Sequence, residues 1–268
     1  MKQQSTFASE QVQGVYDGPE GDLWELVMGH QVHIGGFASS MALADKAGIR
    51  EGWRGVDLCC CSGAGMRFLV RFRGVASMHG VDFTRRSVER CRQRSAAEGL
   101  ADRVEVIEAD ACRSGLPAAS ADFVWGEDAW CYVPHKARLL SEAVRLAKPG
   151  GTVAFTDWVE GPAGLSADEA GRFLRFMKFP DVYSLDDYTR EVRRLGCTVV
   201  CAEDTGLFAP HVDLYLNMLN MQLTYDALRC IGFDLAMLQS LGAEMTFLQG
   251  LARAGKVAQA RVVARTPA

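Results

Sequence analysis

The feature that most constrains the fold is a run of small residues between a strand-like segment and a helix-like segment. Residues 53–58 predict a strand, and the spacing of Met66, Leu69 and Val70 is typical of one face of a helix. Between them, residues 59–65 read Cys-Cys-Cys-Ser-Gly-Ala-Gly, so the backbone can approach a ligand closely. A strand-to-helix turn of this kind presents free backbone N–H groups at the carboxyl edge of an α/β sheet, where a carboxylate or phosphate can bind.

Acidic residues end two further predicted strands. Residues 79–82 predict a short strand that ends at Asp82, and residues 103–110 predict one that ends at Asp110. A carboxylate at the end of the second strand can accept both hydroxyl groups of a ribose. The chain has no G-K-[ST] phosphate loop and no strict G-x-G-x-x-G, and the pattern therefore favours a nucleoside over a nucleoside triphosphate or a dinucleotide.

Four consecutive motifs resemble those of the Rossmann-like S-adenosylmethionine-dependent methyltransferases: residues 57–63, 80–82, 108–110 and 146–151. The resemblance implies an α/β fold with a seven-stranded, doubly wound, mostly parallel sheet and an α-helical cap, and S-adenosylmethionine as the cofactor. It implies a set of cofactor-binding residues: Asp57, Cys59, Cys61, Gly63, Arg67, Asp82, Phe83, Asp110, Ala111 and Glu127. The family usually has glycines where Cys59 and Cys61 stand, and we therefore expect a slightly altered turn that still binds the cofactor.

Within that family, the chain most resembles the glycine, sarcosine and dimethylglycine N-methyltransferases. Residues 28–35 are similar to the "W-G-x-D-I-H-x-G" stretch of this group, residues 127–130 to "Q-D-A-F", and residues 175–181 to "D-R-I-K-L-H-D". The resemblance implies catalytic roles for Asp128, His33 and Trp130. It implies substrate contacts from Trp24, His33, Trp130, Asp157, Trp158, Arg175 and Tyr183, with Arg175 as a fork for a carboxylate.

The expected reaction is methyl transfer to a small zwitterionic amino acid, by N-methylation of glycine, sarcosine or dimethylglycine. Glu127 and Trp130 differ from the pattern of that group, and S-methylation of methionine is therefore a close alternative. O-methylation of a natural product is a third reading, and a cofactor-binding protein without chemistry is a fourth. An amine must be neutral to attack, whereas a thioether has no proton to lose, so the first two differ in their pH dependence.

The pattern along the chain predicts three parts. Residues 1–37 are expected to form an N-terminal lid, residues 38–160 the cofactor-binding core, and residues 161–268 the rest of the sheet. An inserted helical cap is expected at about residues 207–252. Asp22 is predicted to cap a helix within the lid, and the arginine-rich helix at residues 87–99 is predicted to face solvent.

Composition excludes several other classes. A net charge of −4 argues against a nucleic-acid surface, and no apolar run reaches transmembrane length. The first residues lead into no signal core, so we expect a cytoplasmic protein with a small-molecule substrate and without a membrane partner. Nine cysteines without a CxxC pair indicate reduced thiols rather than a metal site. The expected assembly states include a homodimer.

Overall fold

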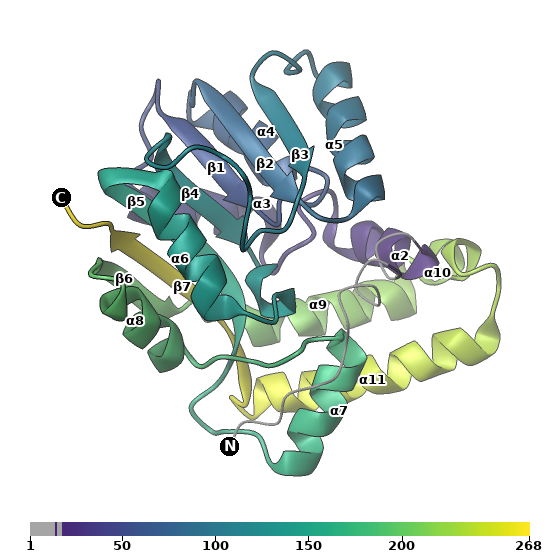
Figure 1. Cartoon of the computed structure of the whole chain (residues 1–268). Coiled ribbons are helices and arrows are strands. Elements are labelled where there is room, and N and C mark those ends of the chain that lie inside the picture. The colour runs from purple at the N-terminus through teal and green to yellow at the C-terminus, as the bar shows by residue number, and fades with distance from the viewer. Residues whose placement is uncertain (1–13, 15–17) are drawn as a thin grey trace.

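The computed structural model describes residue 14 and residues 18–268, and a single seven-stranded sheet forms its centre. The strand order is β3-β2-β1-β4-β5-β7-β6, and β1 to β5 are parallel while β7 runs antiparallel to both of its neighbours (Figure 1). The strands are β1 (Arg54–Leu58), β2 (Ser77–Asp82), β3 (Val104–Glu108), β4 (Ala121–Glu127), β5 (Ala147–Glu160), β6 (Thr198–Asp204) and β7 (Val257–Arg265). The predicted α/β class with a mostly parallel sheet is confirmed.

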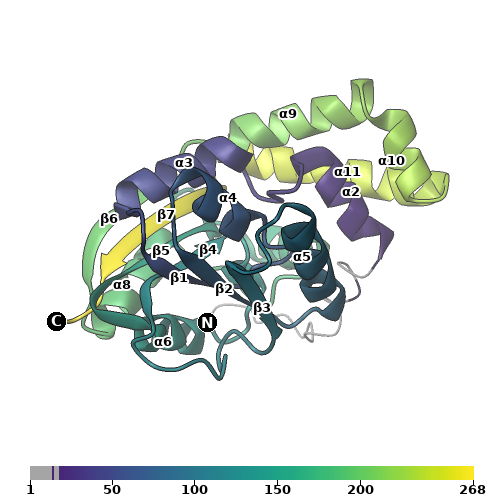
Figure 2. The same ribbon diagram turned by 90° about the horizontal axis from the view of Figure 1, so that it is seen from above.

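Helices cover both faces of this sheet (Figure 2). One face carries α3 (Gly36–Ala47), α4 (Ala64–Phe72) and α5 (Arg85–Ala97), and the other carries α6 (Lys136–Leu146) and α8 (Leu185–Arg194). Because a sheet between two helical layers is buried on both sides, its strands are apolar nearly throughout. In β4, for example, Val124 packs toward α6, while Phe123 and Trp125 pack toward α3 and α4.

A group of further helices lies beyond the carboxyl ends of β1 to β4 (Figure 1). It contains α2 (Pro19–Met28), α7 (Ala167–Met177), α9 (Phe208–Met221), α10 (Thr224–Cys230) and α11 (Leu235–Arg253). The last three fall within the range of about residues 207–252 where an inserted helical cap was expected, or extend one residue past it. Within the described residues, no helix has both the length and the apolar character needed to span a membrane.

The helix α2 begins earlier than predicted. Its N-cap is Gly18, and Pro19 occupies the first helical position, where its missing N–H costs no hydrogen bond. Asp22 therefore does not cap the helix. Of the expected lid at residues 1–37, residues 1–13 and 15–17 lie outside the described part of the chain.

Asp22 and Glu25 instead connect α2 to the arginine-rich helix α5. Arg86 and Arg90 bind Asp22, and Arg90 and Arg94 bind Glu25, with the closest N–O distances at 2.5 and 2.6 Å. Arginines four residues apart lie on one face of a helix, and so all three reach α2. The prediction that the arginines of α5 face solvent is wrong for Arg86, Arg90 and Arg94. These three side chains hold α2 beside the carboxyl edge of the sheet.

Candidate active site

The turn after β1 adopts the backbone conformation that glycines usually supply. Cys59 and Cys61 have φ angles of 64° and 47°, and Gly63, the N-cap of α4, has a φ of 74°. A left-handed backbone costs a non-glycine residue roughly 1–2 kcal/mol. The turn is anchored to the end of β2, because Cys59 N donates to Val81 O at 2.8 Å and Cys61 N donates to Asp82 Oδ2 at 2.8 Å.

Asp82 is the anchor of that turn and faces a cavity at the same time. Its second oxygen, Oδ1, accepts a hydrogen bond from Thr84 N at 2.9 Å. Burial raises the pKa of the Asp82 carboxyl, and the backbone hydrogen bonds oppose that rise. The Asp82 carboxylate also lines the cavity, so it is a candidate acceptor for hydrogen bonds from a ligand.

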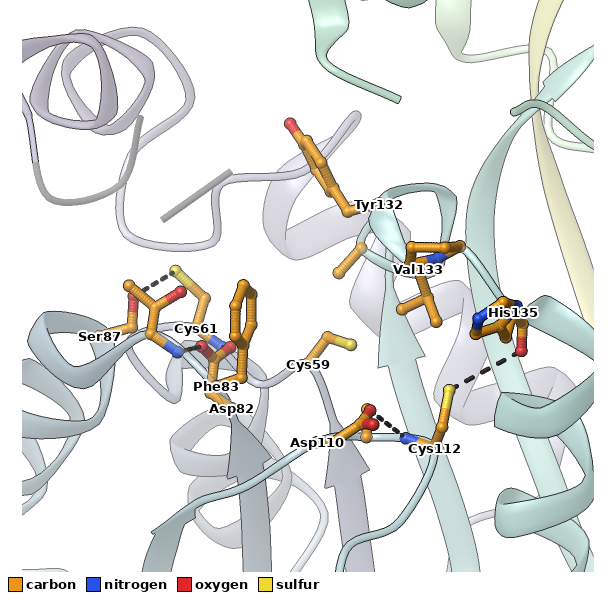
Figure 3. Close-up of a pocket in the computed structure, with 14 residues that line it drawn as sticks. Cys59, Cys61, Asp82, Phe83, Ser87, Asp110, Cys112, Tyr132, Val133 and His135 are labelled. Atoms are coloured by element: carbon orange, nitrogen blue, oxygen red, sulfur yellow. Dashed lines mark hydrogen bonds between the residues drawn. The ribbon is translucent and has the colours of Figure 1, made fainter. Parts of the chain in front are cut away.

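A cavity of about 350 Å³ opens beside Asp82, at the carboxyl ends of β1 to β4. In Figure 3, the Phe83 ring stands next to the Asp82 carboxylate, Asp110 and Cys112 lie at the opposite side, and Tyr132 lies above them in this view. The residues that line it are Cys59, Cys61, Asp82, Phe83, Thr84, Ser87, Asp110, Ala111, Cys112, Ala129, Tyr132, Val133, Pro134 and His135. Apolar surface dominates, and the two acids supply the charge.

A smaller cavity of about 50 Å³ continues from the first, since Cys59, Cys61 and Ala129 line both. Residues 29–35, between α2 and α3, are called the N-terminal loop below. The walls of the smaller cavity are the turn after β1, the acids Asp57, Glu127 and Asp128, and residues 30–32 of this loop. Gly65 lets Glu127 approach closely, because a Cβ at this position would lie 2.5 Å from Glu127 Oε2 and would displace that carboxylate. Together the two cavities form an elongated cleft. The cavity of about 350 Å³ is its wide end, and the cavity of about 50 Å³ is its narrow end.

The narrow end concentrates buried acids. Burial raises the pKa of Asp57 well above its ordinary value, and the neighbouring Glu127 raises it further. Burial also raises the pKa of Asp128, whereas the nearby His33 lowers it. Glu127 Oε1 accepts a hydrogen bond from Ser40 Oγ at 2.6 Å and lies 3.3 Å from His33 Nε2. The narrow end is therefore suited to a cationic ligand group.

Most of the predicted cofactor residues line the cleft: Asp57, Cys59, Cys61, Asp82, Phe83, Asp110, Ala111 and Glu127. Asp128, predicted to be catalytic, also lines it. Gly63 caps α4 without lining either cavity. Arg67 is a correction, because its guanidinium is buried behind the turn, where Nη1 donates to Ser62 O at 2.6 Å and Nε donates to Glu98 at 2.8 Å. It supports the turn and does not face the cleft.

The other two residues predicted to be catalytic lie outside the cleft walls. His33 is buried, and its Nε2 lies 3.1 Å from Ser40 Oγ and 3.3 Å from Glu127 Oε1, an acid that lines the cleft. Trp130 is fully buried, donates from Nε1 to Leu58 O at 3.1 Å and stacks on Phe155 at 4.2 Å between ring centroids. Because Trp130 belongs to the core, the prediction that it touches substrate is wrong for this structure.

The remaining predicted substrate residues line neither cavity: Trp24, Asp157, Trp158, Arg175 and Tyr183. Trp158 is buried against the rings of Phe179 and Phe208, and Tyr183 packs on Tyr188. Arg175 is exposed on α7, whose opposite side buries Phe173 and Leu174. The carboxylate clamp predicted for Arg175 is therefore absent from this arrangement of the described residues.

Sequence reasoning missed several residues of the wide end, namely Thr84, Ser87, Cys112 and residues 132–135. All of them follow the carboxyl end of a strand by two to eight residues. Their position directly after the predicted strand ends was the signal that could have identified them, since parallel strands bring these ends to one edge of the sheet.

Comparison with known proteins identifies the family. A model of the family described as "Methyltransferase domain" matches residues 56–155. A dimethylglycine N-methyltransferase from Parasynechococcus marenigrum (strain WH8102) is 30% identical over 217 residues, which cover 74% of this chain and 76% of that relative. The chain belongs to the S-adenosylmethionine-dependent methyltransferases. The prediction that the chain is an S-adenosylmethionine-dependent methyltransferase is confirmed, and S-adenosylmethionine is its cofactor.

Other similar proteins carry different names. A 27-O-demethylrifamycin SV methyltransferase from Amycolatopsis mediterranei (strain S699) is 29% identical over 202 residues, covering 70% of this chain and 74% of the relative. A phosphoethanolamine N-methyltransferase 2 from Haemonchus contortus, solved with phosphomonomethylethanolamine and S-adenosylhomocysteine, has a TM-score of 0.86 at 19% identity. That likeness covers 98% of this chain and 61% of the other, and shows a shared fold.

Behind the wide end of the methyltransferase cleft, a buried polar cluster holds the residues after β4. Asp157 accepts hydrogen bonds from the Tyr188 hydroxyl and from Cys131 N, the latter at 3.0 Å. The buried Lys136 ammonium donates to Cys131 O and Val133 O, both at 3.2 Å, and pairs with the Asp181 carboxylate. Burial raises the pKa of Asp157 to about 7.

This shift predicts a pH-dependent stability. The folded pKa of Asp157, about 7, lies above the unfolded value of about 3.9, so the folded protein holds a proton that the unfolded chain has released between these values. The contribution is complete below about pH 4 and is lost as the pH rises through about 7. Asp157→Asn should therefore reduce the fall in unfolding free energy between about pH 4 and 7, by a few kcal/mol at most.

Urea unfolding at several pH values measures this difference. Asp168→Asn, on the exposed first turn of α7, is the matched control and should keep the pH dependence of the native protein. Parallel curves for the native protein and Asp157→Asn would contradict the assignment of the titration to Asp157.

Proposed function

We propose that the cleft holds S-adenosylmethionine with its adenosine portion in the wide end and its methionyl portion in the narrow end. The observation that supports this is the shape and charge of the cleft. Asp82 can accept the ribose hydroxyls beside the Phe83 ring, and Asp110 can accept from the adenine amino group. Glu127 and Asp57 lie where an ammonium group needs acidic partners.

The same cleft supports an amine as the methyl acceptor, as the sequence predicted. Five carboxyl groups line its two cavities, those of Asp57, Asp82, Asp110, Glu127 and Asp128. Among the described residues, no lysine or arginine lines either cavity. Such a site attracts a cationic amine, and it leaves the carboxylate of an amino acid to backbone N–H groups rather than to a cationic side chain. We therefore propose N-methylation of a small amine, and glycine-type amino acids are its first members to test because of the 30% identical relative.

The chain's own residues give the amine a way to lose its proton. S-adenosylmethionine supplies the electrophilic methyl group, and the nucleophile must reach it as a neutral amine. Glu127 lines the cleft, and its Oε1 connects through Ser40 Oγ to His33 Nε2 over 2.6 and 3.1 Å. In the proposal Glu127 accepts the proton from the amine, and His33 Nε2 is the second acceptor along this buried route. The predicted catalytic role of His33 is retained in this indirect form.

A hydroxyl group is the second candidate acceptor. The 29% identical rifamycin-type relative is consistent with this reading. Methionine S-methylation is the third, because a thioether needs no proton acceptor.

A panel of acceptors distinguishes these functions. The methyltransferase is incubated with S-adenosylmethionine that carries a trideuterated methyl group and with one acceptor class at a time. The classes are glycine, sarcosine and dimethylglycine; amines without a carboxylate; methionine; and phenolic or polyketide alcohols. We expect mass spectrometry to place the label on nitrogen. Label found only on sulfur or oxygen, across the whole panel, would contradict the proposal.

A further inference from the structure

Gln259 is a polar residue in the interior of β7, and its side chain is fully buried. Position 259 lies in the antiparallel part of the sheet, far along the chain from the motifs that bind the cofactor. A buried amide is retained only where its donors and acceptor find partners. The partners of Gln259 belong to segments more than 50 residues away on the chain.

The amide of Gln259 joins three segments. Nε2 donates to Asp128 Oδ1 and Oδ2 at 2.9 and 2.8 Å, and to Ile34 O at 3.1 Å. Oε1 accepts from Thr205 Oγ1 at 2.8 Å, which fixes the orientation of the amide. Asp128 Oδ2 also accepts a hydrogen bond from Ile34 N at 2.8 Å, so Gln259, Asp128 and Ile34 are each hydrogen-bonded to the other two.

Both backbone groups of Ile34 are therefore held by this arrangement. Ile34 belongs to the N-terminal loop, whose residues 30–32 form one wall of the narrow end of the cleft. Asp128 forms part of the opposite wall with a φ of 50°, a conformation that a non-glycine residue adopts only when its surroundings fix it. Without the Gln259 donor, the Asp128 carboxylate and Ile34 O lose their shared partner.

We propose that Gln259 is a positioning residue that closes the narrow end of the cleft by holding the N-terminal loop against Asp128. The inference rests on the proposed placement of the methionyl group at that end. It does not involve the wide end, whose lining residues Gln259 does not touch. The two ends can therefore be tested separately with ligands that differ only in the methionyl portion.

Calorimetry with two ligands makes this test. S-adenosylhomocysteine extends into both ends of the cleft, whereas 5′-methylthioadenosine lacks the amino and carboxyl groups and fills only the wide end. Gln259→Met keeps the side-chain length and removes the donor. We expect it to weaken S-adenosylhomocysteine binding at least about tenfold, as for loss of a hydrogen bond to a charged group, with 5′-methylthioadenosine affected less than about twofold.

A control variant separates positioning from general destabilisation. Val262→Ala removes buried volume from the same strand, but Val262 packs in the core cluster on the α6 and α8 side. Its affinities for the two ligands should keep the native ratio. An equal loss of both ligands in Gln259→Met, or an unchanged affinity for both, would overturn the proposal.

Hydrogen–deuterium exchange without any ligand gives a second measurement that does not depend on where the cofactor lies. Peptides across residues 29–37 should exchange faster in Gln259→Met, while peptides across β7 keep their protection. Thr205→Val removes the hydroxyl that orients the amide, which also accepts a hydrogen bond from Leu207 N at 3.2 Å, and it should produce the same change to a smaller extent. Native exchange at residues 29–37 in both variants would overturn the proposal even if ligand affinity had changed.

Discussion

Asp82→Asn should weaken binding of S-adenosylhomocysteine by about 2–4 kcal/mol, which is about 30- to 1,000-fold. The carboxylate accepts hydrogen bonds from Cys61 N and Thr84 N, and in our proposal also from both ribose hydroxyls. An asparagine amide has only one acceptor oxygen. Its NH2 group would face a backbone N–H, so both the turn after β1 and the ribose contacts are lost.

Isothermal titration of the folded variant measures this loss. Glu108→Gln is the matched control, because Glu108 pairs with Asp82 in the register of β2 and β3 but is exposed and does not line the cleft. It should bind S-adenosylhomocysteine as the native protein does. A folded Asp82→Asn variant with native affinity would remove Asp82 from the cofactor site.

Trp130→Ala should lower the free energy of unfolding by about 3–5 kcal/mol, the usual cost of removing a large aromatic ring from a core. The indole is fully buried, stacks on Phe155 and packs against Gly126, where an added Cβ would lie 2.3 Å from the indole nitrogen. Trp130→Phe keeps most of the ring but leaves Leu58 O without its indole donor, and should cost about 1–3 kcal/mol.

Urea unfolding monitored by circular dichroism measures both variants. Leu216, a half-buried residue of α9, offers a control site, since Leu216→Ala removes less buried surface and should cost less. If Trp130→Phe keeps native stability and instead raises the KM of the acceptor, then Trp130 contacts substrate, as the sequence resemblance first implied.

Much of the fold could be predicted because it depends on local patterns. The run of small residues at 59–65 and the acids at the ends of β2 and β3 identified one edge of the sheet, where both cavities lie. Local patterns did not predict whether a side chain near this edge points into the cleft or into the core. Trp130 lies two residues after Asp128, yet it turns into the core, because its indole has a partner in Leu58 O.

Contacts between distant segments also escaped the sequence. Arg67 has the right offset from the glycines for a carboxylate contact, but Glu98 of the following helical segment binds it instead. Gln259 lies in an apolar strand with no motif, and its importance depends on Ile34 and Asp128, which are more than 100 residues away. Such pairs are decided by tertiary packing, which a single sequence does not specify.

The pH dependence of kcat/KM tests the central claim, methyl transfer to an amine nitrogen, most directly. The measurement uses saturating S-adenosylmethionine from about pH 6 to 9, with the best amine of the acceptor panel and with methionine. Protonation removes the nucleophilic lone pair of an amine, so the account predicts that kcat/KM rises about tenfold per pH unit below the pKa of the amine. A flat profile with methionine, together with no turnover of any amine, would contradict it.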